Sequence, residues 1–261
     1  MQTRIHAAVL LLVVESMVPE TLSADPDRPA WNGKVQQWAT LREVMHGTVM
    51  EGQVRLSEVI GKRHIYGIGA PDKLQGEILI ADSEVWIAKI QDGNHVETRQ
   101  TDGTKETAVF LAVSQVPNWS EVTLDRDVSA EEFDEFMQQT LSRAGLQELE
   151  TVPFVIEGKF PSVDLHVLNG QCPFGEAKSD LEGAGPPHRA SLKDARGLLV
   201  GFYSESGAGR ITHHWTRTHV HALLDTEAKN RMAGHVDAVS LQSGTVVRIP
   251  DGPGNRDQQK R

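Results

Sequence analysis

Apolar positions along the chain follow two periods, which predict several strands and a few helices. Short apolar runs bounded by turn residues are typical of strands, whereas apolar residues at three- and four-residue steps are typical of helices. Residues 77–90 contain two apolar runs around Asp82 and Ser83, so they predict a β-hairpin. The other expected strands are 109–116, 198–203, 217–224 and 236–249.

Helical spacing occurs in three places. Residues 32–46 carry apolar side chains at three-residue steps and predict an amphipathic helix. Residues 129–145 begin with Ser129 and Glu132 at the spacing of a capping box, and apolar residues follow at helical steps. A shorter helix is expected within 54–60.

Glycine, proline and polar residues are expected to interrupt these elements. Residues 67–71 predict a loop that leads into a strand, and 92–107 predict polar turns. Residues 152–168 predict two strands around a turn at 158–161. Residues 175–197 predict an irregular excursion.

Strands and helices mix here without regular βαβ alternation, which predicts an α+β fold with two sheet-based halves. We expect an N-terminal mixed-sheet domain at 25–145 and a C-terminal metal-binding mixed-sheet domain at 146–250. The polar tail at 251–261 is expected to be disordered.

The N-terminus has features of a signal peptide. Arg4 precedes an apolar run at 7–14, and small residues follow at 23–24. The run is too short to span a bilayer. We expect residues 1–24 to be a signal peptide and the protein to be secreted or periplasmic. A buried N-terminal helix or strand is the alternative.

Composition excludes several classes of site. The net charge is −10, and such a surface repels phosphate backbones, so no nucleic-acid partner is expected. Cys172 is the only cysteine, which excludes an intrachain disulfide and a thiolate metal cluster. No particular histidine is paired with Cys172 by the sequence, so we do not expect a thiol nucleophile.

Histidines gather near the C-terminal end, where five of the eleven lie between 213 and 235. His219 and His221 alternate along a predicted strand, so their side chains point to one face about 7 Å apart. A turn-rich stretch then separates them from His235 and can return the chain antiparallel. Three imidazoles with an open fourth position are typical of catalytic zinc. Solvated histidines on a surface strand are the alternative.

Two further residues are candidates for proton or anion chemistry. Glu77 stands at the start of the predicted hairpin, where it is either a proton carrier or simply a polar residue at a strand end. His166 alternates with Val163 and Leu165 and therefore faces the opposite side of its strand. An exposed strand histidine is the alternative there.

Five short motifs occur in order between about residues 50 and 240. They are Gly67-Ile68-Gly69 with Leu74-Gln75-Gly76-Glu77, Pro153-Phe154 with Glu157-Gly158 and Phe160, Gly197 to Phe202, His219-Val220-His221, and Gly234-His235-Val236. In this order they resemble the motifs of the α-acetolactate decarboxylases. The resemblance covers most of the chain that would follow a signal peptide.

This resemblance implies a two-domain α/β fold with a mixed sheet in each half, and a homodimer. It implies a three-histidine zinc site that decarboxylates 2-acetolactate to acetoin. His219, His221 and His235 would be the zinc ligands, and Glu77 would be the active-site carboxylate. His166 stands where the family has an arginine that pairs with the substrate carboxylate.

We therefore expect a Zn²⁺-dependent carbon–carbon lyase that acts on a small 2-hydroxy-3-oxo acid, with Glu77 and His166 as catalytic residues. Two alternatives stay open. One is a zinc enzyme for a different small oxo or hydroxy acid. The other is a non-catalytic relative that binds a small ligand.

Overall fold

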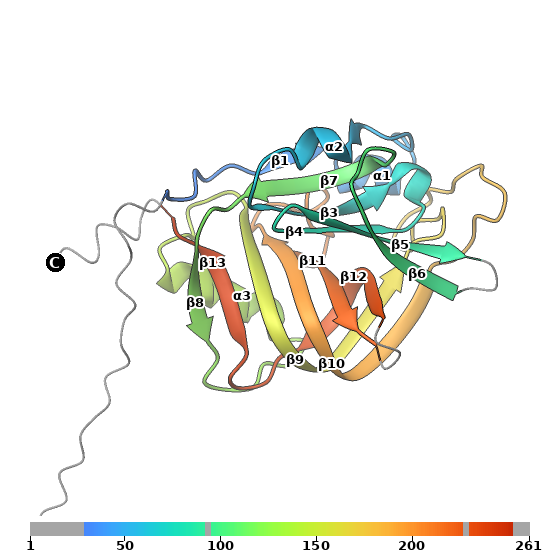
Figure 1. The fold of residues 1–261 in the computed structure, drawn as a ribbon. Helices are drawn as coiled ribbons and strands as arrows, with labels where there is room; N and C mark the ends of the chain where they lie inside the picture. The colour runs from blue at the N-terminus through green and yellow to red at the C-terminus, as the bar shows by residue number, and fades with distance from the viewer. Residues whose placement is uncertain (1–28, 92–94, 227–229, 253–261) are drawn as a thin grey trace, which may run out of the picture.

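The computed structural model describes residues 29–91, 95–226 and 230–252, which form two β-sheets and a few short helices (Figure 1). The first sheet contains β1 (Gln36–Trp38), β2 (Val54–Arg55), β3 (Ile65–Pro71), β4 (Glu77–Ala81), β5 (Glu84–Gln91), β6 (His95–Thr101) and β7 (Thr107–Gln115). The second contains β8 (Trp119–Thr123), β9 (Val152–Val167), β10 (His188–Tyr203), β11 (Thr218–Asp225), β12 (Arg231–Ser240) and β13 (Val246–Pro250). The helices are α1 (Leu41–Met45), α2 (Leu56–Val59), the 3-10 turn η1 (Asp72–Leu74) and α3 (Phe133–Arg143).

The α+β arrangement with two sheets is confirmed, although helices are few. Every pairing between the named strands is antiparallel, where mixed sheets were expected. Consecutive strands that are joined by short turns pair antiparallel, as β4 and β5 do around Asp82 and Ser83. Both turn residues have positive φ, at 48° and 71°, which suits a tight hairpin.

Four predicted interruptions differ from the structure, because strand occupies all or part of each. Residues 152–168 form the single strand β9 rather than two strands, and the ladder with β10 skips only Pro161 and Asp194. Residues 67–71 belong to β3 rather than to a loop. The polar segment 92–107 contains β6, and the excursion at 175–197 ends where β10 begins.

The long helix predicted at 32–46 is also wrong. Residues 36–38 form β1, and only the five residues of α1 are helical. Ala39 has a positive φ of 53°, which a right-handed helix does not allow. Thr40 then caps α1 by a capping box with Glu43, so the helix begins at Leu41.

The predicted signal peptide at 1–24 lies outside the described residues, as does the tail from residue 253 onward. Within the described part of the chain, helices are too short or too polar to cross a membrane.

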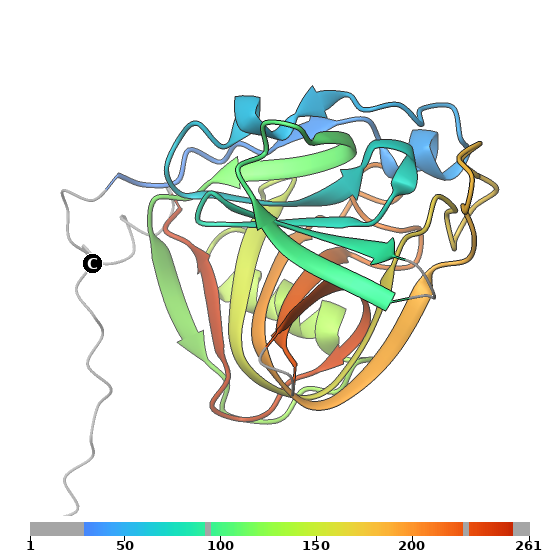
Figure 2. The same cartoon turned by 45° about the vertical axis from the view of Figure 1, so that its right-hand side comes forward.

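Side-chain alternation in the second sheet separates two layers of core. Phe154 of β9 and Val220 of β11 pack with Phe133 and Met137 of α3. Figure 2 shows α3 behind the strands of this sheet. Val155, the neighbour of Phe154, instead packs with residues of the first sheet. The face opposite α3 is therefore buried between the two sheets.

Four strands of the second sheet pair in a closed cycle. β10 pairs with β9 and β11, β11 pairs with β12, and β12 pairs with β9. Because β12 is held on both sides, the residues on it have defined partners on β11 and on β9. This cycle fixes which side chains meet on the buried face.

Gly69 of β3 gives a test of how tightly the first sheet is assembled. A Cβ at this position would collide with the backbone carbonyl oxygen of Phe110 on β7, which cannot rotate away. We expect Gly69→Ala to lower the free energy of unfolding by about 1–3 kcal/mol. Urea denaturation measures the change. Gly61→Ala is the control, because no heavy atom lies within 4 Å of its Cβ position. Equal stability of the two variants would contradict the close packing.

Candidate functional site

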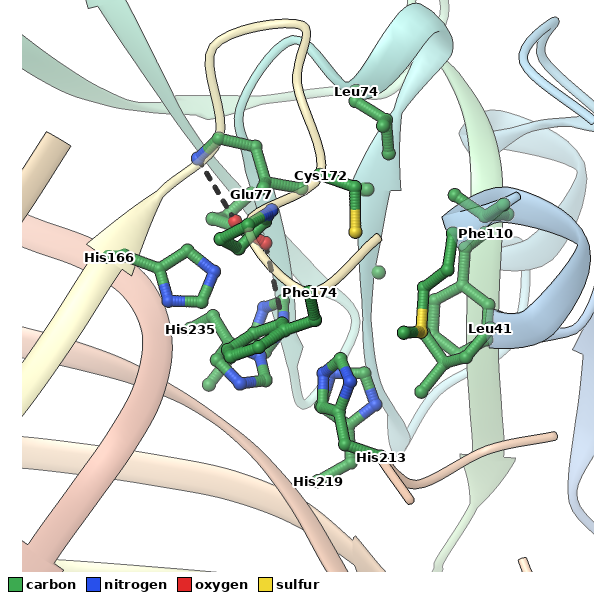
Figure 3. A pocket seen from close by; sticks show the side chains of 17 residues that line it. Leu41, Leu74, Glu77, Phe110, His166, Cys172, Phe174, His213, His219 and His235 are labelled. Atoms are coloured by element: carbon green, nitrogen blue, oxygen red, sulfur yellow. Dashed lines mark hydrogen bonds and ion pairs between the residues drawn. The ribbon is translucent and has the colours of Figure 1, made fainter. Parts of the chain in front are cut away.

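Strand register brings four histidines to the face between the sheets. On β11, His219 and His221 are two residues apart and point to the same side. The ladder pairs His221 with His235 of β12, and it pairs His235 with His166 of β9. Directly opposed residues on an antiparallel ladder share a face. Figure 3 shows His166, His219 and His235 gathered on one side of the cavity.

Two imidazoles are oriented by backbone carbonyls. Nδ1 of His219 donates to the Ile211 carbonyl at 2.8 Å, and Nδ1 of His221 donates to the Ile78 carbonyl at 2.9 Å. Each bond requires the proton on Nδ1 and leaves the Nε2 lone pair free. Metal-binding histidines in proteins are commonly held in this way.

The buried imidazoles are held neutral, which is the form that binds metal. His219, His221 and His235 are 3%, 1% and 7% exposed. Burial lowers the pKa of His221 to about 3. Burial, followed by the charges of neighbouring histidines, lowers the pKa of His219 and of His235 well below the usual value. None of the three is expected to carry a proton that competes with a metal near neutral pH.

Two groups of three side chains have ligand atoms that all lie within 4.8 Å of one another. One group is His213, His219 and His235, and the other is His166, His235 and Asp237. His221 is in neither group among the described residues, although its ring centroid lies 5.3 Å from that of His219 and 5.4 Å from that of His235. The structure thus gathers the three predicted ligands and adds His213 beside them.

Glu77 reaches the histidines from the first sheet. Its Oε1 accepts the Leu168 amide at 3.1 Å, and its Oε2 lies 3.6 Å from Nε2 of His221 (Figure 3). The side chain is 2% exposed, and burial raises its pKa well above the usual value. Burial therefore favours the protonated form of this carboxyl group, which is the form that can donate a proton.

His166 is buried, so the alternative of an exposed strand histidine is wrong. Its Nδ1 bonds to Oδ1 of Asp237 at 2.8 Å, and Arg189 donates to Oδ2 of the same carboxylate at 2.8 Å. These two contacts orient the His166 ring, whose centroid lies 4.6 Å from that of His235. His166 therefore presents its other nitrogen toward the cluster.

Two cavities meet at the histidines. The inner one has a volume of about 50 Å³ and is lined by Glu77, His166 and the other clustered imidazoles. The outer one has a volume of about 550 Å³ and contains Arg189 and Asp237 in its wall. Phe174, His213 and His235 line both cavities. These three side chains form the boundary between an interior site and a larger approach.

The donor set fits a divalent metal ion. Neutral imidazoles with free nitrogens suit Zn²⁺ and also Cu²⁺, Ni²⁺ and Fe²⁺. A buried carboxyl group stands next to them, and the apolar residues Leu74 and Phe110 line the rest of the inner cavity. This arrangement can bind an ion and keep one or more of its positions open to a small molecule.

Three residues of this site were not among those predicted from the sequence. His213 belongs to the noted histidine cluster but lies in a loop, where no periodicity orients it. Asp237 follows His235 by two residues, a spacing that can place both on one face of a strand. Phe174 lies in an irregular segment and carries no sequence signal that would bring it to the site.

A comparison with protein families finds a match to the model described as alpha-acetolactate decarboxylase, over residues 35–249. The α-acetolactate decarboxylase of Bacillus subtilis strain 168 superposes with a TM-score of 0.62 at 22% identity, covering 83% of this chain and 85% of that one. A Staphylococcus aureus protein of unknown function, described as similar to α-acetolactate decarboxylase, gives 0.61 at 20% identity over 82% and 84%. At these identities the structural likeness shows the fold alone. No curated protein sequence gives a significant match. Because the family model spans most of the chain, this protein belongs to the alpha-acetolactate decarboxylase family.

Proposed function

We propose that this protein is a zinc-dependent lyase that decarboxylates 2-acetolactate to acetoin, with His219, His221 and His235 as ligands. The proposal rests on family membership and on one observation above all. The buried Glu77 carboxyl group, whose pKa is raised by burial, has its Oε2 3.6 Å from Nε2 of His221, beside the imidazole cluster of the inner cavity. Decarboxylation followed by protonation at carbon needs a metal site that stabilises the developing charge and a group that donates a proton.

The reaction breaks the bond between the carboxylate carbon and C2 of the substrate, and its electron pair stays on the substrate as CO₂ departs. A bound divalent metal supplies a Lewis acid for the charge that develops on the substrate oxygens. Glu77 then donates its proton to C2, which completes acetoin. The Leu168 amide holds the Glu77 carboxyl in place during this transfer.

His166 is proposed to contact the substrate carboxylate. It lines the inner cavity, and Asp237 accepts from its Nδ1, so its Nε2 faces inward. An imidazole offers one hydrogen bond where an arginine offers a bidentate pair. This difference favours a second candidate function, which is the same chemistry on a different small 2-hydroxy-3-oxo acid.

The function is tested on the purified full chain by metal analysis and an acetoin assay with racemic acetolactate. We expect about one zinc per chain, as a single site requires, and formation of acetoin. If zinc is bound but no acetoin forms, 2-acetolactate is not the substrate, and a different small oxo acid is favoured. Neither zinc nor acetoin would favour a non-catalytic relative.

Asp237→Asn tests whether the orientation of His166 matters. An asparagine can present its amide nitrogen to Nδ1 and so favour the wrong imidazole tautomer. We expect kcat/KM for acetolactate to fall on the order of 10²-fold, the scale on which a misplaced catalytic group is felt. Metal content should not change. Asp225→Asn, at an exposed position at the end of β11, is the control. A variant as active as this control would exclude the positioning role, and loss of metal would instead make Asp237 a ligand.

A further inference from the structure

His213 is an imidazole that the three-ligand assignment does not use. It lies in the segment between β10 and β11, and its ring centroid is 5.4 Å from that of His219 and 5.2 Å from that of His235. One ligand nitrogen from each of these three residues lies within 4.8 Å of the others. That spacing suits a common ion at the centre.

The backbone around His213 is held relative to the cluster. The Ile211 carbonyl, two residues earlier, accepts the Nδ1 proton of His219. The carbonyl oxygens of Gly209 and Arg210 accept amide protons from α1. The residues just before His213 are therefore bonded both to the site and to α1, which places His213 beside His219.

One ring nitrogen of His213 also lacks a hydrogen-bond partner among the described residues. This nitrogen is Nδ1, and it is buried. In contrast, Nδ1 of His219 and Nδ1 of His221 are each bonded to a carbonyl. A buried polar nitrogen without a partner is unusual in a folded protein, and a metal ion satisfies it.

We propose that His213 is a fourth imidazole ligand of the metal centre, supplied by a loop. The inference rests on the proposed function only for the presence of a metal at this site. His213 lies where the inner and outer cavities meet, so this ligand stands on the path that a small molecule takes to the metal. Unlike the ligands on β11 and β12, it can leave the metal without breaking a strand pairing.

The test is Co²⁺ binding to the metal-free full chain, measured by competition with a chelator and by visible absorption. His213→Phe keeps an aromatic ring against Phe174, whose centroid is 4.6 Å from that of His213, but removes both nitrogens. We expect this variant to bind Co²⁺ about tenfold or more weakly, with an altered ligand-field spectrum. His214→Phe, at the exposed neighbouring position, is the matched control and should behave as wild type.

The outcomes separate the two proposals. If His213→Phe binds Co²⁺ with the affinity and spectrum of His214→Phe, His213 is not a ligand, while the metal centre stands. If the wild-type chain binds no Co²⁺, both the metal centre and the fourth ligand are overturned. His213→Ala is the second variant, and its agreement with His213→Phe excludes a disturbance by the larger ring.

Discussion

Replacing His219 with alanine is expected to remove the metal and to abolish decarboxylation. His219 lies within ligand range of both His213 and His235, and its ring stacks on Phe110 with centroids 5.6 Å apart. Loss of a hydrogen-bond partner of a ligand costs roughly 10- to 100-fold in metal affinity. Loss of the ligand itself should cost more, so the variant should be purified without metal. Elemental mass spectrometry and the acetoin assay measure both effects.

The control for this variant is His214→Ala, which changes a histidine five positions away at an exposed site. It should keep both metal and activity. A His219→Ala protein with the same metal content as this control would show that the ion, if one binds, is held elsewhere. Circular dichroism of both proteins shows that the comparison concerns folded chains.

Replacing Glu77 with glutamine should leave the metal in place and lower kcat by about 10²- to 10⁴-fold, the range of a general acid. The amide has nearly the same shape and keeps an oxygen for the Leu168 amide proton, but it cannot donate a carboxyl proton. Because glutamine is uncharged and burial disfavours the charged form of Glu77, the substitution adds no buried charge and should not unfold the protein. Single-turnover kinetics with acetolactate and metal analysis measure the two expectations.

Glu84→Gln, at the exposed start of β5, is the matched control for this variant. If Glu77→Gln retained the activity of Glu84→Gln, the proton that reaches C2 would have to come from another group. If it lost metal as well as activity, Glu77 would be a ligand rather than a proton donor. The two measurements together distinguish these roles.

Local sequence patterns predicted the elements whose residues repeat with a clear period. The hairpin at 77–90 and the strand β7 follow from apolar runs that are bounded by turns. The strand β9 could not be predicted in full, because Gly158 and Pro161 are turn residues by composition. The continuous strand depends on its ladder with β10, whose paired residues lie 21 to 51 positions further along the chain. Such long-range pairing is absent from any local window.

In the site, too, local patterns predicted some positions, whereas others depend on long-range packing. Alternation on β11 was enough to place His219 and His221 on one face, and the turn after them made an antiparallel return to His235 a reasonable expectation. The contact between Glu77 and His221 depends on how the two sheets face each other. Since no local pattern encodes that packing, only the family resemblance connected the two residues in advance.

The closed cycle of strand pairings has a consequence for how this protein can change during evolution. A slip of one residue in β12 would turn His235 away from the cavity, and it would have to be matched on both β11 and β9. Insertions within these strands are therefore strongly disfavoured. The irregular segments that contain Phe174 and His213 are not held by strand pairing, so positions in them other than the proposed ligand His213 can vary in length and sequence more readily. New substrate preferences in this scaffold should arise from those segments, while the histidines on the strands stay in place.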